Sequence, residues 1–168
     1  MSLYNMLFGQ NIMSDFILAT IGLTQQDVGR FRDCFIEKAG NGDFVIAVYT
    51  RNGGGNREHW NNSYKEYVEG ENCPCPGCII EYKLPKHPLY IKDRDDDFDH
   101  TYATIYFKLP KEYEKELIQW VIADKKTASN KFLNLIESLE KGEQTPQTKK
   151  ALEVGRIVFD KIKQVQEG

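Results

Sequence analysis

The chain has 168 residues, of which 40% are hydrophobic, and a formal net charge of −3 at pH 7. This length fits one domain with its own core, and the negative net charge disfavours a protein that coats nucleic acid through general electrostatics. No apolar run reaches the roughly 20 residues of a membrane span, and the first residues lack a secretory signal pattern, so we expect a cytoplasmic protein.

Short helices are expected in the first part of the chain. The opening residues place apolar side chains at helical spacing before Gly9, which predicts an N-terminal helix with a glycine C-cap. Ser14 is the expected N-cap of a second helix that ends at Gly22. Thr24 is the expected N-cap of a third, which runs to about Phe31.

Alternating and β-branched residues then predict an antiparallel sheet of about three strands. Residues 34–36 and 44–50 read as a hairpin around the glycine-rich turn 39–43, and residues 101–107 add a third strand. Residues 60–78 have no clean period, so we expect a loop or a short helix there.

Amphipathic helices are expected in the remainder of the chain, over residues 112–124 and 131–141 and after Pro146, which follows Thr145 near the N1 position. The side chains expected on their apolar faces are Tyr113, Leu117, Trp120, Val121, Phe132, Leu135, Ile136, Leu139, Leu152, Ile157, Val158, Phe159 and Ile162. The predicted fold class is therefore α+β, with short N-terminal helices, a small antiparallel sheet and a C-terminal helical segment. We expect a single domain over residues 1–168, with an α+β core at 1–110 and a helical tail at 111–168 packed on it.

An arginine-flanked glycine run, Arg-Asn-Gly-Gly-Gly-Asn-Arg, follows the second predicted strand at residues 51–57. Glycine admits positive φ and leaves backbone N–H groups accessible, and two guanidiniums would complete a cradle for phosphate or carboxylate. The expected ligand-binding residues are Arg51, Gly53, Gly54, Gly55, Asn56 and Arg57. A hairpin loop that only needs glycine explains the run equally well, and no P-loop or dinucleotide fingerprint matches it.

A cysteine cluster indicates a structural zinc site. Cys73, Cys75 and Cys78 have C-x-C-x2-C spacing within a proline- and glycine-containing turn, which lets several thiolates reach one ion. Zinc takes four ligands in such sites, and His59 is the nearest fourth ligand, which gives a Cys3His set. The alternative fourth ligands are His87, Cys34 and His100. The other interpretation is that the cysteines are thiols or a redox pair.

An acidic cluster precedes the third predicted strand and comprises Asp93, Asp95, Asp96, Asp97 and Asp99. Such a run is usually a solvated face. It would otherwise bind a divalent cation, or pair with Arg51 and Arg57 in a charge network. In an enzyme, Asp97 and Asp99 would act with His100 as acid–base groups.

Three segments, at residues 1–9 (MSLYNMLFG), 49–57 (YTRNGGGNR) and 95–104 (DDDFDHTYAT), resemble a family of small proteins encoded by bacteriophages and prophages. The resemblance covers roughly residues 1–110 and supplies no catalytic residues. It implies an accessory protein in the host cell cytoplasm, including anti-defence proteins that inhibit a nuclease or sequester a nucleotide signal.

We therefore expect a binding protein rather than an enzyme. Its partner would be an anionic, nucleotide-like small molecule or a host defence protein, held by the arginine-flanked loop together with Asp97 and Asp99. The aromatic residues expected to stack a base are Tyr49, Trp60, Tyr64 and Tyr67. The alternatives are a metal-dependent phosphoester hydrolase that uses residues 93–99, or an acidic nucleic-acid mimic that inhibits a host nuclease. The amphipathic tail offers a surface for a homodimer.

Overall fold

A computed structural model of the chain has the predicted α+β fold and describes residues 11–51, 60–61, 66–67, 78–95, 102–124 and 126–167. The helix expected over residues 1–9 lies outside these ranges. The chain divides into a helical unit, residues 1–22 and 109–168, and a sheet unit, residues 23–108. The single-domain organisation stays a prediction.

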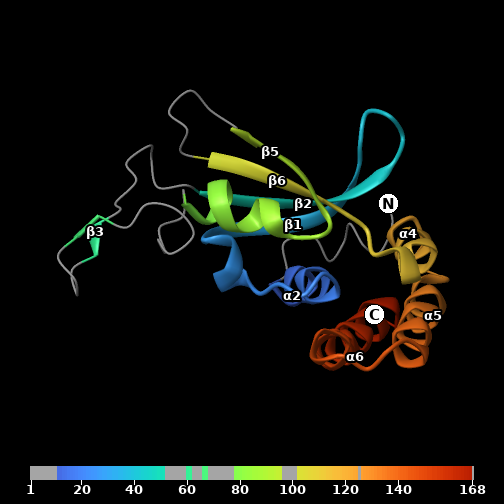
Figure 1. Ribbon diagram of the computed structural model, residues 1–168. Helices are drawn as coiled ribbons and strands as arrows, with labels where there is room; N and C mark the ends of the chain where they lie inside the picture. Colours follow the sequence, from blue (N-terminus) through green and yellow to red (C-terminus); the bar gives the residue numbers. More distant parts are fainter. Residues whose placement is uncertain are drawn as a thin grey trace. The chain divides into compact units, whose positions relative to one another are not determined.

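The sheet unit is built on four antiparallel strands in the order β1-β2-β6-β5 (Figure 1). They are β1 (Arg30–Lys38), β2 (Phe44–Arg51), β5 (Tyr90–Asp95) and β6 (Tyr102–Lys108). The predicted hairpin and the predicted third strand are confirmed, and the structure shows that this third strand, β6, pairs with β2. The count of about three strands is one too low, because β5 is a charged edge strand, and edge strands favour charged residues over an apolar alternation.

One face of this sheet is buried and forms the core of the unit. Its side chains from the four-stranded sheet are Cys34, Ile36, Ile46, Val48, Ile105 and Phe107. The 3-10 helix η1 (Gln25–Val28) is tied to the sheet because the Thr50 hydroxyl donates to the Val28 carbonyl at 3.0 Å. The π-helical turn η2 (Ile79–Lys83) and the 3-10 turn η3 (Leu84–Lys86) follow one another and add buried apolar side chains. The core therefore lies on one side of the sheet.

Two further short strands pair with each other in the segment that the sequence predicts as a loop or a short helix. Trp60 of β3 (Trp60–Asn61) is opposite Tyr67 of β4 (Glu66–Tyr67). This antiparallel pair forms a separate sheet from the four-stranded one.

The helical unit contains α2 (Asn11–Thr20), α4 (Glu114–Val121), α5 (Ala128–Lys141) and α6 (Pro146–Glu167), with the 3-10 turn η4 (Lys111–Tyr113) before α4. Helix α2 contacts α6, α6 contacts α5, and α5 contacts α4. None of the described helices combines the length and the apolar character that crossing a bilayer requires.

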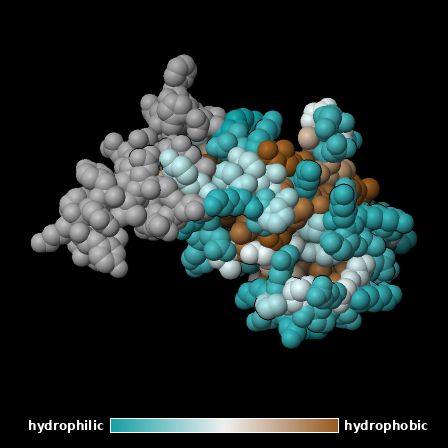
Figure 2. All heavy atoms as spheres, in the orientation of Figure 1, coloured by the Kyte–Doolittle hydropathy of each residue, from teal (hydrophilic) through white to brown (hydrophobic). Residues whose placement is uncertain are grey.

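Three aromatic rings form the centre of the helical unit. The ring of Phe16 lies 6.0 Å from that of Trp120 and 5.2 Å from that of Phe132, and the last two are 4.9 Å apart. Most of the side chains predicted for the apolar helix faces are buried, but Ile157 is 47% exposed and lies outside the buried face of α6. Figure 2 shows mainly hydrophilic side chains over α5 and α6, as expected for amphipathic helices.

The helix ends are partly as predicted. The Thr148 N–H donates to the Thr145 hydroxyl at 3.1 Å, which confirms a capped start at Pro146. Ser14 lies inside α2 and does not cap it. The turn after Thr24 is a single 3-10 turn that ends at Val28, because Gly29 adopts a positive φ of 85° and β1 begins directly after it.

Candidate functional site

The sheet face opposite the core carries three half-buried tyrosines, Tyr49 on β2 and Tyr102 and Tyr106 on β6. Successive side chains of a strand point to opposite faces. Since Ile46 and Val48 are in the core, Tyr49 belongs to the other face, and the register places it opposite Thr104, between the two β6 tyrosines. We call this surface the tyrosine face.

Positive charge gathers on the tyrosine face. The strand register, together with the contact of Arg32 with Tyr102, places six basic residues there, Arg30, Arg32, Arg51, Lys92, Arg94 and Lys108, all of them exposed. Among the described residues of the four strands, Asp33 and Glu37 are the acidic residues that share this face. A chain with a net charge of −3 therefore has a locally cationic surface. Such a surface attracts anionic ligands.

Tyr102 is the centre of a first cluster of a ring and cations. The guanidinium carbon of Arg32 lies 4.4 Å from the centroid of the Tyr102 ring, and that of Arg51 lies 5.5 Å from it. Arg32 sits at the irregularity in pairing between Phe31 and Asp33, a local bulge that adds one residue to β1. The cluster therefore joins residues of β1, β2 and β6 on one surface.

Tyr106 is the centre of a second cluster. The Lys92 ammonium lies 5.7 Å from the centroid of the Tyr106 ring, and the Arg94 guanidinium lies 5.8 Å from it. Both cations come from β5, in which Lys92 is directly opposite Tyr106. The two clusters thus take their cations from opposite sides of β6.

Tyr49 lies on the same face as the Tyr102 and Tyr106 clusters, and its hydroxyl is engaged in a hydrogen bond. It donates a hydrogen bond to the Glu37 carboxylate, and its ring is 5.5 Å from that of Phe35. Burial, together with the hydrogen bond to Glu37 and its charge, raises the pKa of Tyr49 well above the usual range. Tyr49 is therefore a neutral aromatic surface at physiological pH.

Of the predicted ligand-binding residues, Arg51 lies within the part of the chain that the structure describes. Arg51 ends β2 on the tyrosine face. The other predicted residues, Gly53, Gly54, Gly55, Asn56, Arg57, Asp97 and Asp99, lie outside the described ranges. Sequence reasoning missed Arg32, Tyr102 and Tyr106 as candidates, although the spacing of Tyr102, Thr104 and Tyr106 in a predicted strand already indicates one shared face.

Of the four predicted zinc ligands, Cys78 lies within the described ranges. Cys78 is fully buried directly before η2, whereas His59, Cys73 and Cys75, like the alternative ligand His100, lie outside the described ranges. Within those ranges, no group of three or more His, Cys, Asp or Glu residues is arranged to hold a metal ion. The zinc site stays a prediction.

The two described alternative ligands have structural surroundings of their own. Cys34 is buried in the sheet, and burial together with the charges of Asp33 and Glu37 raises the pKa of its thiol well above its usual value. The His87 Nδ1 accepts the Leu89 N–H at 3.0 Å. The Cys34 side chain is therefore enclosed in the sheet core, and the Nδ1 lone pair of His87 is used within the chain.

The acidic cluster begins within a strand, since residues 93–95 belong to β5. The Asp93 carboxylate accepts a hydrogen bond from the Tyr90 hydroxyl at 3.2 Å. By register, Asp93 lies opposite Ile105 and so on the other side of β5 from Lys92 and Arg94. The acidic and basic residues of this strand are therefore sorted by face, which leaves the tyrosine face cationic.

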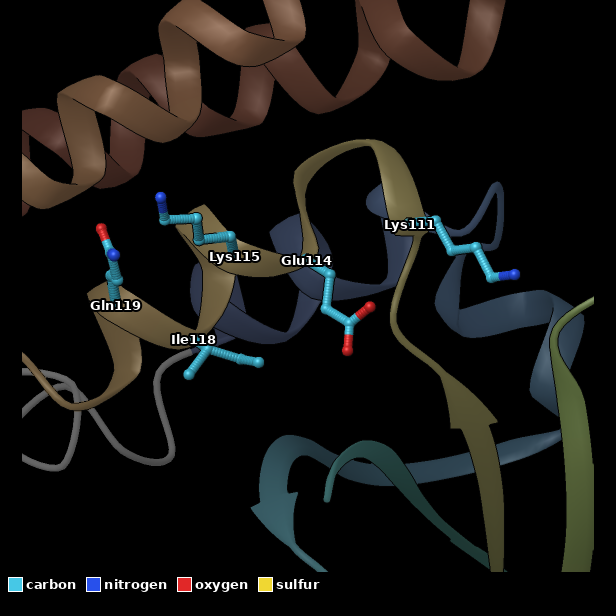
Figure 3. A pocket seen from close by; sticks show the side chains of 5 residues that line it. All are labelled: Lys111, Glu114, Lys115, Ile118 and Gln119. Atoms are coloured by element: carbon cyan, nitrogen blue, oxygen red, sulfur yellow. The ribbon is translucent and has the colours of Figure 1, made fainter. Parts of the chain in front are cut away.

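A shallow pocket of about 450 Å³ in the helical unit is lined by Lys111, Glu114, Lys115, Ile118 and Gln119. Lys111 comes from η4 and the other four residues come from α4. Figure 3 shows that these side chains point in different directions and do not converge on one point. Ligand sites need a few convergent polar groups. The tyrosine face is therefore the stronger candidate.

Comparison with known proteins gives one viral relative. The chain is 32% identical over 96 residues to "Uncharacterized protein L792" of Acanthamoeba polyphaga mimivirus. The similarity covers 56% of this chain and 31% of the mimivirus protein, so the chain corresponds to about a third of that relative's length. No protein-family model and no solved structure matches the chain.

Proposed function

We propose that this protein binds an anionic, nucleotide-like ligand on the tyrosine face. The observation that carries the proposal is the Tyr102 cluster, in which one half-buried ring lies within cation–π range of the guanidiniums of Arg32 and Arg51. An aromatic ring stacks on a nucleobase, and a guanidinium forms paired hydrogen bonds with a phosphate. The cluster brings together the two kinds of group that such a ligand needs.

Arg51 connects this surface to the arginine-flanked loop expected from the sequence. It is the last residue of β2 and the first residue of the run at 51–57. A phosphate near Arg51 would therefore be within reach of the backbone of that run. The loop and the tyrosine face together would form one anion site rather than two.

The groups on the tyrosine face suit binding better than turnover. They are mainly guanidiniums, ammoniums and phenol rings. Of the two carboxylates that the described residues place on this face, that of Glu37 accepts the Tyr49 hydroxyl and that of Asp33 accepts the Cys34 N–H at 3.0 Å. A general base has to reach the proton that it removes. We therefore propose a protein that captures its ligand unchanged.

The resemblance to phage-encoded proteins and the similarity to a mimivirus protein support a viral accessory role for this capture. In an infected cell, the protein would sequester a nucleotide signal or block a host defence protein that handles nucleic acid. We also propose a Cys3His zinc site formed by His59, Cys73, Cys75 and Cys78. Metal binding there would stabilise the fold of the segment that follows the glycine run.

Calorimetric titration with mono- and dinucleotides tests the proposal. Wild type is expected to bind at least one of them with an affinity that weakens as salt rises. Arg51→Gln should weaken binding at least about tenfold, since a charged hydrogen bond contributes roughly 1.5–3 kcal/mol. The matched control is Arg156→Gln, which removes the same charge from an exposed position on α6. Equal affinities for the two variants would exclude Arg51 from the site.

A further inference from the structure

The two ring–cation clusters point to a more specific ligand. We infer that the tyrosine face binds single-stranded nucleic acid, with Tyr102 and Tyr106 stacking different bases of one strand. This inference rests on the proposed function and adds the length and the form of the ligand.

The spacing of the rings requires more than one base. Tyr102 and Tyr106 are four residues apart on the same strand and on the same face. At a rise of about 3.3 Å per residue, their backbones are about 13 Å apart. One nucleobase cannot stack on both rings, so a mononucleotide uses half of the surface.

The cations are placed on both sides of β6. Arg32 and Arg51 approach Tyr102 from β1 and β2, and Lys92 and Arg94 approach Tyr106 from β5. A strand whose bases lie on the two rings would therefore have cations near its phosphates at both rings. Tyr49, which belongs to the same face between the β6 tyrosines, adds a third aromatic surface along this path.

The chemistry of the surface favours a single strand over other anions. In a duplex the bases are already stacked and paired, so their faces cannot stack on tyrosines of a sheet. An acidic peptide would neutralise the cations but would leave the aromatic rings without an equivalent contact. A single strand presents phosphates and uncovered base faces together.

Fluorescence anisotropy with labelled oligonucleotides tests the inference on the full chain. Single strands of two, four and eight nucleotides, as DNA and as RNA, are compared with a duplex of the same sequence and with unlabelled mononucleotides as competitors. We expect the four-nucleotide strand to bind at least about tenfold more tightly than a mononucleotide, because a second base gains a stacking surface. We expect the duplex to bind more weakly than either strand of four or more nucleotides.

Variants then test the Tyr102 cluster and the Tyr106 cluster separately. Tyr102→Leu and Tyr106→Leu should each weaken binding of the four-nucleotide strand about tenfold. Arg32→Gln and Arg94→Gln should each reduce the salt dependence, with the slope of log affinity against log salt falling by about 0.7 for each phosphate that is no longer neutralised. Arg156→Gln is the control for charge, and an unchanged thermal midpoint identifies the variants that remain folded.

The outcomes separate the two proposals. A mononucleotide that binds as tightly as the four-nucleotide strand would overturn the single-strand inference and leave the proposed function intact. A duplex that binds as tightly as the single strand would do the same. No binding of mononucleotides or oligonucleotides would overturn both.

Discussion

The Tyr113 hydroxyl donates a hydrogen bond of 2.8 Å to the backbone carbonyl of Thr20, the last residue of α2. The Gln147 side-chain amide donates to the same carbonyl, also at 2.8 Å. The last carbonyls of a helix have no partner within the helix. Two side chains from later elements thus satisfy the end of α2.

Removing both donors should cost more than the sum of the single changes. Tyr113→Phe and Gln147→Leu each leave one donor, so each should lower the free energy of unfolding by about 1 kcal/mol. The double variant leaves the carbonyl of the fully buried Thr20 without either donor, which adds a desolvation penalty. Urea unfolding of the four proteins measures the coupling, and strictly additive changes would contradict the shared role.

Gly155 allows close packing between α6 and its neighbours. A Cβ at this position would lie 2.7 Å from Ile136 Cδ1 and 3.0 Å from Phe16 Cε1. Gly155→Ala should therefore lower the free energy of unfolding by about 1–3 kcal/mol, despite the better helix propensity of alanine. Thermal and urea unfolding measure the effect.

Two matched variants identify the cause of this destabilisation. Ile136→Val removes the nearest methyl group, so it should restore part of the stability that Gly155→Ala removes. Gly40→Ala adds a Cβ where no atom lies within 4 Å, and it should change stability by less than about 0.5 kcal/mol. A stabilising Gly155→Ala would show that the close approach is relieved without cost.

Asp124 should make part of the stability sensitive to acid. Its carboxylate accepts the Thr127 N–H and the Thr127 hydroxyl, both at 2.9 Å, and these hydrogen bonds lower its pKa below the usual 3.8. A lowered pKa gives stability that is present above the unfolded-state pKa and is lost as the pH falls through the folded-state value. Asp124→Asn removes this titration.

Stability measured from pH 6 to pH 2 tests this. The advantage of wild type over Asp124→Asn should shrink below about pH 4. Thr127→Val removes the hydroxyl donor and should reduce the pH-dependent part of that advantage. A difference between wild type and Asp124→Asn that is constant with pH would contradict the linkage.

Cys34 should resist alkylation in the folded protein. Its side chain is 1% exposed, and burial with nearby Asp33 and Glu37 raises its thiol pKa. The thiolate is the reactive form, so iodoacetamide at pH 8 should label Cys34 only as the sheet unit opens. Peptide mass spectrometry with and without denaturant measures the rate, and rapid native labelling would contradict the burial.

Strong periodicity made most of the fold predictable. In α5, Phe132, Leu135, Ile136 and Leu139 are all buried as expected, because four apolar positions at helical spacing leave one arrangement that buries them. Residues 90–95 gave no such signal, since an edge strand buries little and its sequence reads as a charged run.

The candidate site was less predictable than the fold. Arg51 stood out because of the glycine run beside it, whereas the contact of Arg32 with Tyr102 depends on the lateral order of three strands and on a bulge in β1. Alternation within one strand assigns a side chain to a face, but it does not say which strands are neighbours. The pairing of cations with rings therefore required the sheet topology.

The helical unit is made of residues 1–22 and 109–168, whereas residues 23–108 of the sheet unit are continuous. During synthesis, α2 leaves the ribosome before the sheet segment, and the segment that supplies Trp120 and Phe132, against which Phe16 packs, follows about a hundred residues later. The apolar surface of α2 must therefore stay exposed or be shielded by a chaperone while the sheet segment is translated. A stalled or truncated product that ends before α5 would carry this surface uncovered, and it would be the form of the chain most prone to aggregate.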